Sequence, residues 1–436
     1  MNTLARGMIV AAPRSGSGKT VVTLGLQRAF ARRGIAVAGA KCGPDYIDPA
    51  FHAAASGGPS INLDGFAMPA AMLRGLACDI ASRAELVIAE GAMGLFDGAR
   101  VAGRSGAAAD VAHLTGWPIL LVVDAEAAAQ SVAAIAHGCT GFPGAPPIAG
   151  VIVNRVASDR HAAMIADGFA RIDLPVFGMI RRNPALELPS RHLGLVQAGE
   201  TAALEGRIDA IAGRIAAECE LDAIHAAACP IIAAEPVPPA LRPPGRRIAV
   251  AHDAAFAFFY PHIERWWRSA GADLHFFSPL ADDAPPEQCD ACWLPGGYPE
   301  LHAARIAGNR RFLDGLRKFA TTRPVHGECG GYMVLGRSLE DADGMQHAMA
   351  GLLPVDTSFA RRRMTLGYRR ATLREVTGFA AAGQSLLGHE FHYATIVRGA
   401  DEGAPLADMT DAEGNPLPPA GHRAGLVTGS FFHLIA

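Results

Sequence analysis

The amino-acid sequence predicts an α/β protein made of two units in tandem, each built around a largely parallel sheet. In the first half, short unbroken apolar runs alternate with helical stretches. Strands that are apolar on both faces are typical of a parallel sheet covered by helices. A proline-rich segment interrupts the pattern, which then starts again before the chain becomes rich in strands. We therefore expect two domains with separate cores.

Each half contributes its own strands. In the first half we expect strands at residues 8–12, 35–40, 86–89, 119–123, 151–153 and 176–180. In the second half we expect them at 248–251, 274–277, 292–294 and 324–326, then in a β-rich stretch at 366–373, 389–397 and 426–433. The six prolines between residues 230 and 247 suit neither a helix nor a central strand. The predicted organisation is a domain over 1–229, a linker over 230–245 and a domain over 246–436.

Composition and charge narrow the class of protein. The 436 residues carry a formal net charge of -3 and give a pI of about 6.6, so the chain lacks the basic character of a nucleic-acid-binding protein. No apolar run approaches the roughly 20 residues that span a bilayer. We therefore expect neither nucleic acid nor a membrane as a partner. The eight cysteines are scattered, which favours a reducing compartment over a disulfide scaffold and predicts a cytoplasmic protein.

A glycine-rich loop follows the first expected strand. Residues 13–20 read Pro-Arg-Ser-Gly-Ser-Gly-Lys-Thr, and a helical stretch follows. Such loops bind phosphates through backbone N–H groups at a helix N-terminus. Gly16 and Gly18 would let ATP approach the backbone closely. Lys19 would neutralise the β- and γ-phosphates, and Thr20 would hold Mg²⁺. The usual GxxxxGK[ST] pattern is matched except for its first glycine, which is Pro13 here.

Several carboxylates follow strands in the first half, where the carboxyl ends of parallel strands face the ligand crevice. Glu90 ends one strand and Asp124 closes another. Asp45 and Asp48 lie in a loop that contains two prolines and leads to His52. These acids are candidates for binding Mg²⁺ or for orienting a substrate carboxylate. A helix cap or an aspartate-rich turn explains the same residues, and that alternative stays open.

A second reactive loop lies in the other half. Gly327-Glu328-Cys329-Gly330-Gly331 follows the expected strand at 324–326. A G-x-C-x-G turn between a strand and a helix places the nucleophile at the top of a sheet. We expect the helix N-terminus to lower the pKa of the Cys329 thiol.

Two further features of this half would complete the chemistry of a cysteine nucleophile. His433, near the end of the chain, is the candidate general base and acid. The backbone N–H groups of Gly296 and Gly297 are candidates for an oxyanion hole. An inert cysteine in a tight turn and an ordinary terminal histidine are the alternatives.

These motifs resemble two known folds. The Pro-Gly-Gly loop at 295–297, the cysteine turn and the histidine near the end resemble class I glutamine amidotransferases, which have a flavodoxin-like fold. The first half resembles the dethiobiotin-synthetase-like P-loop fold. Over its whole length the chain resembles the cobalamin-biosynthesis glutamine amidotransferases, the cobyrinic acid and hydrogenobyrinic acid a,c-diamide synthases. The most specific segments are 43–49, 90–98, 251–256 and 388–393.

The resemblance implies an ATP- and glutamine-dependent carbon–nitrogen ligase. Asp45, Asp48 and Glu90 would lie in the site for ATP and the substrate carboxylate. Mg²⁺ would bind among Thr20, Asp48 and Glu90, and the sequence leaves open which of the two aspartates contacts it. Asn154 would lie near the adenine.

The resemblance also implies the reaction of the second half. Cys329 would attack glutamine and His433 would pass a proton to the departing ammonia. The usual triad adds a glutamate two residues after the histidine, where this sequence has Ile435. That leaves open what orients His433.

The substrate implied by the resemblance is a tetrapyrrole or corrin polycarboxylate. ATP would convert its a and c acetate side chains to acyl phosphates, and ammonia from glutamine would turn them into amides. Three arginine clusters are candidates for contacts with this polyanion, at 181–182, 361–363 and 369–370. Solvated surface charge is the alternative for each cluster.

Other functions fit parts of the sequence. The same chemistry could act on nickel sirohydrochlorin or another corrinoid, although segment 43–49 argues against a cobyric acid synthase. In a different class, the chain would be a P-loop nucleotide switch with an inactive amidotransferase domain, because Arg14 stands where partition ATPases carry a signature lysine. The sequence leaves open whether the macrocycle holds cobalt, which arm reacts first, and whether the protein forms a homo-oligomer.

Overall fold

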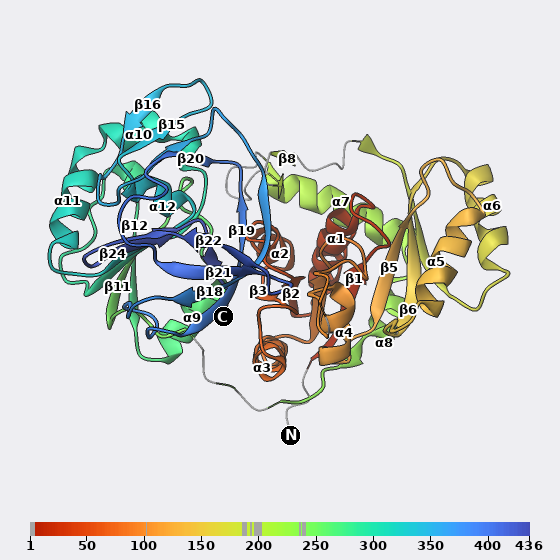
Figure 1. Cartoon of the computed structure of the whole chain (residues 1–436). Helices are drawn as coiled ribbons and strands as arrows, with labels where there is room; N and C mark the ends of the chain where they lie inside the picture. Colours follow the sequence, from red (N-terminus) through yellow and green to blue (C-terminus); the bar gives the residue numbers. More distant parts are fainter. Residues whose placement is uncertain are drawn as a thin grey trace. The chain divides into compact units, whose positions relative to one another are not determined.

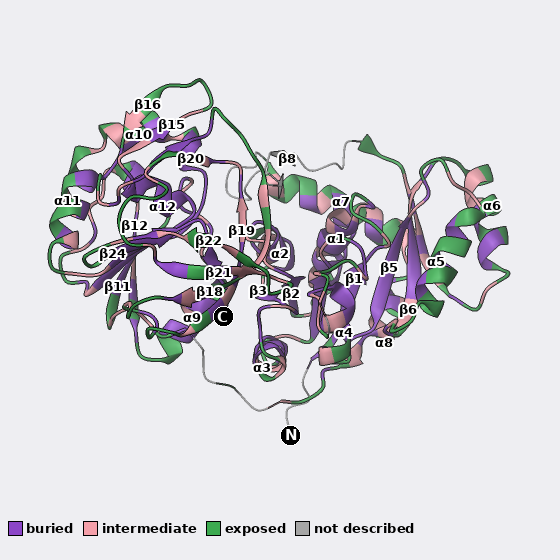
Figure 2. Cartoon of the chain, viewed as in Figure 1, coloured by how far each residue is buried: buried purple, intermediate pink, exposed green. Residues whose placement is uncertain are grey.

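The computed structural model describes residues 5–101, 103–184, 190–191, 194–195, 203–234, 237 and 241–436. The chain divides into two compact units, Met1–Val237 and Pro238–Ala436 (Figure 1). Both units combine helices with a buried, mostly parallel sheet, which confirms the predicted α/β class (Figure 2). No helix within the described ranges is long and apolar enough to cross a membrane.

The first unit is built on a sheet of order β3-β2-β4-β1-β5-β6-β7, in which all neighbours run parallel. The strands are β1 (Arg6–Ala11), β2 (Val37–Cys42), β3 (Ser60–Leu63), β4 (Leu86–Glu90), β5 (Ile119–Asp124), β6 (Ile148–Val156) and β7 (Val176–Arg181). The short β10 (Cys229–Pro230) runs antiparallel to β1, and β8 (Ser190–Arg191) pairs with β9 (Gly194–Leu195). This order brings the carboxyl ends of β1, β2 and β4 together.

Helices connect and cover these strands. They are α1 (Lys19–Arg32), α2 (Asp48–Ser56), α3 (Ala70–Ala81), α4 (Ala108–Thr115), α5 (Ser131–Gly141), α6 (Asp159–Phe169), α7 (Leu204–Glu218) and α8 (Leu221–Ala227). Alternate side chains of β1, such as Met8 and Val10, pack against apolar residues of α1 and α7. A Cβ on Gly25 would lie 2.4 Å from Ile215 Cγ1, so this glycine lets α1 and α7 touch. The resulting core holds α1 and the phosphate loop before it on a rigid sheet.

The second unit contains three sheets. The mostly parallel sheet has the order β12-β11-β13-β14-β24-β23 and comprises β11 (Arg247–Ala251), β12 (Asp273–Phe277), β13 (Ala291–Leu294), β14 (Val325–Glu328), β23 (His422–Ala424) and β24 (Val427–Ser430). The antiparallel sheet has the order β22-β21-β18-β19-β25 and comprises β18 (Thr365–Leu373), β19 (Ser385–His392), β21 (Ala407–Asp411), β22 (Pro416–Ala420) and β25 (His433–Leu434). The smallest comprises β15 (Ser338–Glu340), β16 (Gln346–Ala348), β17 (Asp356–Ser358) and β20 (Thr395–Arg398).

The helices of the second unit are short. They are α9 (Pro261–Ser269), α10 (Ala303–Gly308), α11 (Arg310–Ala320) and α12 (Gly330–Leu335), with 3₁₀ turns η3 (Pro279–Ala281) and η4 (Pro299–Leu301). The sharp strand–turn–helix from β14 to α12 places Cys329 at the carboxyl end of a central strand. The predicted position of the cysteine in a turn between a strand and a helix, at the top of a sheet, is therefore confirmed.

The sequence analysis did not predict several strands, among them β3, β15, β16, β17, β21, β22 and β23, and it joined others that the structure divides. β3 was not predicted, because its polar Ser60 and Asn62 interrupt the apolar pattern, although both are buried. The expected strand at 389–397 is divided between β19 and β20, and that at 426–433 between β24 and β25. In both places a single extended stretch passes from one sheet to another.

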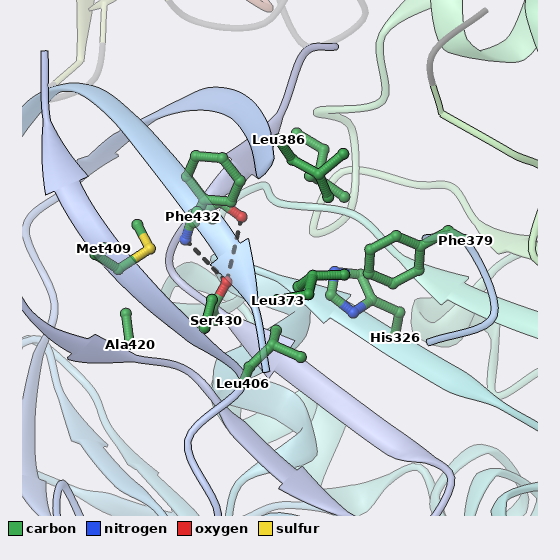
Figure 3. Close-up of a pocket in the computed structure, with 12 residues that line it drawn as sticks. His326, Leu373, Phe379, Leu386, Leu406, Met409, Ala420, Ser430 and Phe432 are labelled. Atoms are coloured by element: carbon green, nitrogen blue, oxygen red, sulfur yellow. Dashed lines mark hydrogen bonds between the residues drawn. The ribbon is translucent and has the colours of Figure 1, made fainter. Parts of the chain in front are cut away.

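The bend between β24 and β25 is fixed by one hydroxyl group. Ser430 Oγ accepts a hydrogen bond from Phe432 N at 3.2 Å and lies 3.5 Å from Phe432 O, as Figure 3 shows. Apolar side chains that include Leu373 and Leu386 surround this bend. The bend carries the chain out of the parallel sheet just before His433.

The predicted linker over 230–245 lies partly outside the described residues. At its start, Pro230 pairs with Arg6 of β1. Near its end, the side chain of Leu241 is fully buried and Arg242 N donates to Phe379 O. The two ends of the segment are thus integrated into the two units, and its limits as a linker stay a prediction.

Candidate functional site

The predicted phosphate loop connects β1 to α1. Gly18 has a φ of 92°, and a Cβ there would lie 2.1 Å from Asn154 Nδ2, so the position requires glycine. Asn154, near the end of β6, donates from Nδ2 to Ser17 O at 2.9 Å. The structure thus brings Asn154 onto the loop, and its contact with adenine stays a prediction.

Two side chains at the start of α1 point toward the end of β4. Lys19 donates from Nζ to Met93 O at 2.6 Å. Burial lowers the pKa of Lys19, and the nearby Glu90 acts in the opposite direction. Thr20 donates from Oγ1 to Glu90 Oε1 at 2.7 Å. The predicted residues Lys19, Thr20 and Glu90 therefore form one site.

Asp124 serves a different part of the loop. Its Oδ2 accepts hydrogen bonds from Arg14 at 2.9 Å and from Arg155 at 2.6 Å. Arg155 also donates to Gly16 O at 2.9 Å. Asp124 therefore links Arg14 of the phosphate loop to Arg155 of β6 instead of joining Thr20 and Glu90. The sequence reasoning did not single out Arg155, because its contact with the loop depends on the neighbouring position of β5 and β6 in the sheet.

A buried charge cluster, the Lys41 cluster, lies at the carboxyl ends of β2 and β4. It consists of Thr20, Lys41, Asp48, His52 and Glu90. Lys41 and Glu90 are directly paired in the parallel ladder. Lys41 Nζ lies 2.5 Å from Asp48 Oδ2 and 3.0 Å from Glu90 Oε1. His52 donates from Nε2 to Glu90 Oε2 at 2.8 Å. Asp48 and Glu90 thus contact the same ammonium group, and their shared role in a site stays a prediction.

The ammonium group of Lys41, which lies between the buried carboxyl groups of Asp48 and Glu90, influences the charge of both. Burial alone would raise the pKa of Glu90, but Lys41, His52 and Thr20 together hold it well below its usual range. Burial, together with the charge of Asp45, raises the pKa of Asp48 to about 8. Burial opposes the charge on Lys41, yet Asp48 and Glu90 outweigh it and raise the lysine pKa. Glu90 is therefore the ionised partner of Lys41 at neutral pH.

The sequence reasoning gave no role to Lys41 or His52 in this cluster. The available signal was the position of Lys41, which ends a strand as Glu90 does. His52 lies in α2, and its contact with Glu90 depends on how that helix packs on the sheet.

Asp45 has a local structural role. Its Oδ1 accepts hydrogen bonds from Ile47 N at 2.7 Å and Asp48 N at 2.9 Å. The carboxylate thus holds the turn that leads into α2. Its predicted catalytic role stays a prediction, as does the division of metal binding between Asp45 and Asp48.

The oxygen donors of the Lys41 cluster suit a hard cation. Mg²⁺ is commonly bound by one or two carboxylates and a hydroxyl, with water and substrate phosphates completing the shell. Thr20 and Glu90, which are in direct contact, supply such a donor set. No three His, Cys, Asp or Glu side chains in the described ranges form a metal-binding group by themselves. The cluster therefore suits an ion that arrives with a nucleotide.

The backbone of Cys329 is strained, as is typical of a nucleophile on a sharp turn between a strand and a helix. Cys329 has φ 47° and ψ -103°, a conformation that non-glycine residues rarely adopt. Cβ atoms on the flanking glycines would clash, since one on Gly331 would lie 2.0 Å from Leu294 O. One on Gly330 would lie 3.1 Å from Gly297 N, so the Pro-Gly-Gly loop packs directly against the turn.

Gly296 lies against both predicted catalytic side chains. A Cβ on Gly296 would be 2.5 Å from His433 Cε1 and 3.3 Å from Cys329 Cβ. The structure thus brings His433, Cys329 and the predicted oxyanion loop to one place. The role of Gly296 and Gly297 as an oxyanion hole stays a prediction.

We expect Gly296→Ala to lower the kcat of glutamine hydrolysis by about 10²-fold, because the new methyl group would displace His433 or the cysteine turn. The matched control is Gly308→Ala at the end of α10, where a Cβ would meet no atom within 4 Å. Steady-state release of glutamate from glutamine measures both variants. Equal activity of the two would show that the space beside Gly296 is not needed.

The charge states at this site differ from the sequence expectation. Burial, together with Glu300, raises the pKa of the Cys329 thiol, and the Gly330 N–H only partly opposes this. The expected lowering by the helix N-terminus is therefore outweighed, because the sulfur is enclosed. Burial also lowers the pKa of His433, with further lowering by His389 and His392. The thiol and the imidazole are thus both neutral, and the proton must move when glutamine is attacked.

The arginine clusters have different surroundings. Arg181 pairs with Asp159, and Arg182 lies 3.3 Å from Glu126. Arg369 pairs with Glu390 at 2.7 Å, whereas Arg370 is exposed. All three residues at 361–363 are exposed, and the Arg362 guanidinium lies 4.9 Å from the centre of the Phe359 ring. The 361–363 cluster therefore presents the most accessible positive charge of the three.

Comparison with known proteins agrees with the two sites. Residues 8–196 match the CobQ/CobB/MinD/ParA nucleotide binding domain, and residues 247–436 match the CobB/CobQ-like glutamine amidotransferase domain. Hydrogenobyrinate a,c-diamide synthase of Mesorhizobium japonicum is 52% identical over 99% of both chains. The protein of that name from Rhodobacter capsulatus is 55% identical, again over 99% of both chains. With a phosphate loop and a cysteine site on one chain and this identity over its whole length, the chain belongs to the hydrogenobyrinate a,c-diamide synthase family.

Proposed function

We propose that the protein converts the a and c acetate side chains of hydrogenobyrinic acid to amides, using ATP and glutamine. The observation that carries this proposal is the presence of two groups of reactive side chains on one chain. The first joins a phosphate loop to the Lys41 cluster. The second joins a strained cysteine to a buried histidine. The relatives that share both halves over their full length carry this activity in their names.

The second unit would supply ammonia. The Cys329 sulfur attacks the side-chain amide carbon of glutamine as its proton passes to His433. The carbon–nitrogen bond breaks, and His433 gives the proton to the departing ammonia, which leaves a glutamyl thioester. Water then hydrolyses the thioester to glutamate and restores the thiol. The N–H groups of Gly296 and Gly297 would stabilise the oxyanion of each tetrahedral intermediate.

The first unit would activate the carboxylate. A side-chain carboxylate oxygen of the substrate attacks the γ-phosphorus of ATP, and ADP leaves. Ammonia then attacks the acyl carbon of the resulting acyl phosphate, and phosphate leaves. Lys19 would neutralise charge on the transferred group, and Thr20 and Glu90 would hold Mg²⁺, which supplies charge stabilisation for the phosphates when bound. Two rounds give the a,c-diamide.

Two further observations support this substrate and setting. The exposed arginines at 361–363 are followed by Met364, and Leu366 lies nearby, with side chains 55% and 57% exposed. Charge beside apolar surface suits a large ring that bears carboxylates. The eight cysteines, all within the described residues, are free, which fits the reducing cytoplasm where we place the enzyme.

Mass spectrometry of hydrogenobyrinic acid, incubated with the protein, Mg-ATP and amide-¹⁵N glutamine, tests the proposal. Gain of two labelled amides that depends on ATP is the expected result. Amidation of cobyrinic acid or nickel sirohydrochlorin instead would keep the mechanism and change the substrate. ATP turnover without amidation of any of them would favour the nucleotide switch.

A further inference from the structure

Ile435 occupies the position that usually carries the glutamate of the catalytic triad, and its side chain has no carboxylate. Ile435 is fully buried, and its N–H donates to Leu387 O at 3.0 Å as part of the pairing with β19. An isoleucine neither orients an imidazole by hydrogen bonding nor stabilises its charged form. Another group must therefore limit the orientations of the His433 ring.

The ring of His433 lies flat against a second histidine. The His389 and His433 rings are stacked, with centroids 5.1 Å apart and an interplanar angle of 12°. The two residues are direct partners in the antiparallel ladder between β19 and β25. His389 is in turn held by the hydroxyl of Tyr260, which shares a hydrogen bond with His389 Nε2 at 3.0 Å. All three side chains are buried.

The backbone around His433 is held independently of this stack. Glu328, the residue before the nucleophile, accepts a hydrogen bond from Leu434 N at 2.9 Å. On the other side, His262 donates from Nε2 to Ile435 O at 3.0 Å. A Cβ on Gly388 would lie 1.9 Å from His433 O, so β19 approaches this strand closely. The main chain around His433 is thus placed by contacts other than the stacked ring.

We propose that His389, held by Tyr260, is the positioning residue that orients His433 in place of the triad carboxylate. A flat ring stacked on the imidazole restricts its rotation and keeps the catalytic nitrogen directed at Cys329. Burial lowers the pKa of His389 to about 3, so the supporting ring is neutral at neutral pH. The proposal rests on the glutaminase half of the proposed function.

The variants His389→Ala, His389→Phe and Tyr260→Phe test this role. Removing the ring in His389→Ala is expected to lower the kcat of glutamine hydrolysis by about 10²-fold, the scale of a misplaced general base. The KM for glutamine should change by less than about 3-fold, because a positioning residue acts through His433 and not on glutamine binding. His389→Phe keeps a flat ring and should recover most of the lost rate. Tyr260→Phe frees the supporting ring and should give an intermediate loss.

Two controls separate positioning from folding. Amidation driven by added ammonium chloride uses the first unit and should be unchanged in all three variants. His347→Ala replaces a histidine of the same unit that instead pairs with Asp341, and it should retain the wild-type rate. Wild-type kcat in His389→Ala would overturn the proposal. So would a Phe variant as slow as the Ala variant, or equal losses with glutamine and with ammonia.

A second measurement needs no substrate. The rate at which iodoacetamide alkylates Cys329, followed by peptide mass spectrometry, reports proton removal by His433. His433→Ala sets the slow limit, and His389→Ala should approach it. An unchanged alkylation rate in His389→Ala would contradict the positioning role, even if the wild-type protein proved unable to hydrolyse glutamine and the proposed function failed.

Discussion

Replacing Cys329 with serine is expected to lower glutamine-dependent amidation by about 10⁴-fold while ammonia-dependent amidation stays within about 2-fold of wild type. Serine fits the same turn, so the strained backbone at this position should persist. The hydroxyl of serine is a far weaker nucleophile than the thiol. Burial also keeps the histidine at this site neutral, as it keeps the thiol of the wild-type protein neutral. In the proposed function, a separate site in the first unit uses ammonia directly.

The measurement is formation of the diamide with either glutamine or ammonium chloride as nitrogen donor, at the same pH. The control is Cys78→Ser, which changes a partly exposed cysteine in α3 of the first unit, and it should be active with both donors. If Cys329→Ser lost activity with ammonia as well, the two units would not divide the reaction as proposed.

Replacing Glu90 with glutamine is expected to affect both nitrogen donors. Amidation should fall by about 10³-fold with glutamine and with ammonia alike. Glu90 accepts hydrogen bonds from Thr20 and His52 and lies 3.0 Å from Lys41 Nζ. The amide of glutamine has one acceptor oxygen instead of two and no charge. The buried Lys41 ammonium would then lose its ionised partner, since the pKa of Asp48 is raised to about 8. The site would also lose the ionised carboxylate proposed to hold Mg²⁺.

Glutamine hydrolysis by Glu90→Gln should remain near the wild-type rate, because Cys329 belongs to the other unit. Glu126→Gln is the matched control, since it makes the same change at an exposed carboxylate that lies near Arg182. Thermal unfolding of both variants checks that the first unit is folded. Wild-type amidation by Glu90→Gln would exclude Glu90 from the activation of the carboxylate.

Much of the fold followed from local pattern. The unbroken apolar runs marked the buried parallel strands of both units, since such strands must be apolar on two faces. The apolar pattern did not predict elements in which polar side chains are buried and hydrogen-bonded. Asn62 in β3 is buried because its amide donates to Gly43 O and Asp45 O. Similarly, Ser430 turns the chain between sheets with one hydroxyl, which leaves no trace in an apolar periodicity.

At each site, short motifs predicted the reactive residues, whereas tertiary packing determined their partners and charges. Motifs in short segments predicted Lys19, Thr20, Glu90 and Cys329, which lie where a strand ends or a helix begins, and the position of His433 near the end of the chain predicted that residue. The packing of segments distant in the chain decided their partners and their charges. Lys41 faces Glu90 through the register of β2 and β4, and His389 faces His433 through that of β19 and β25. Burial then raised the pKa of Cys329 against the expected effect of its helix. Desolvation depends on every neighbouring atom, so only the folded chain could set it.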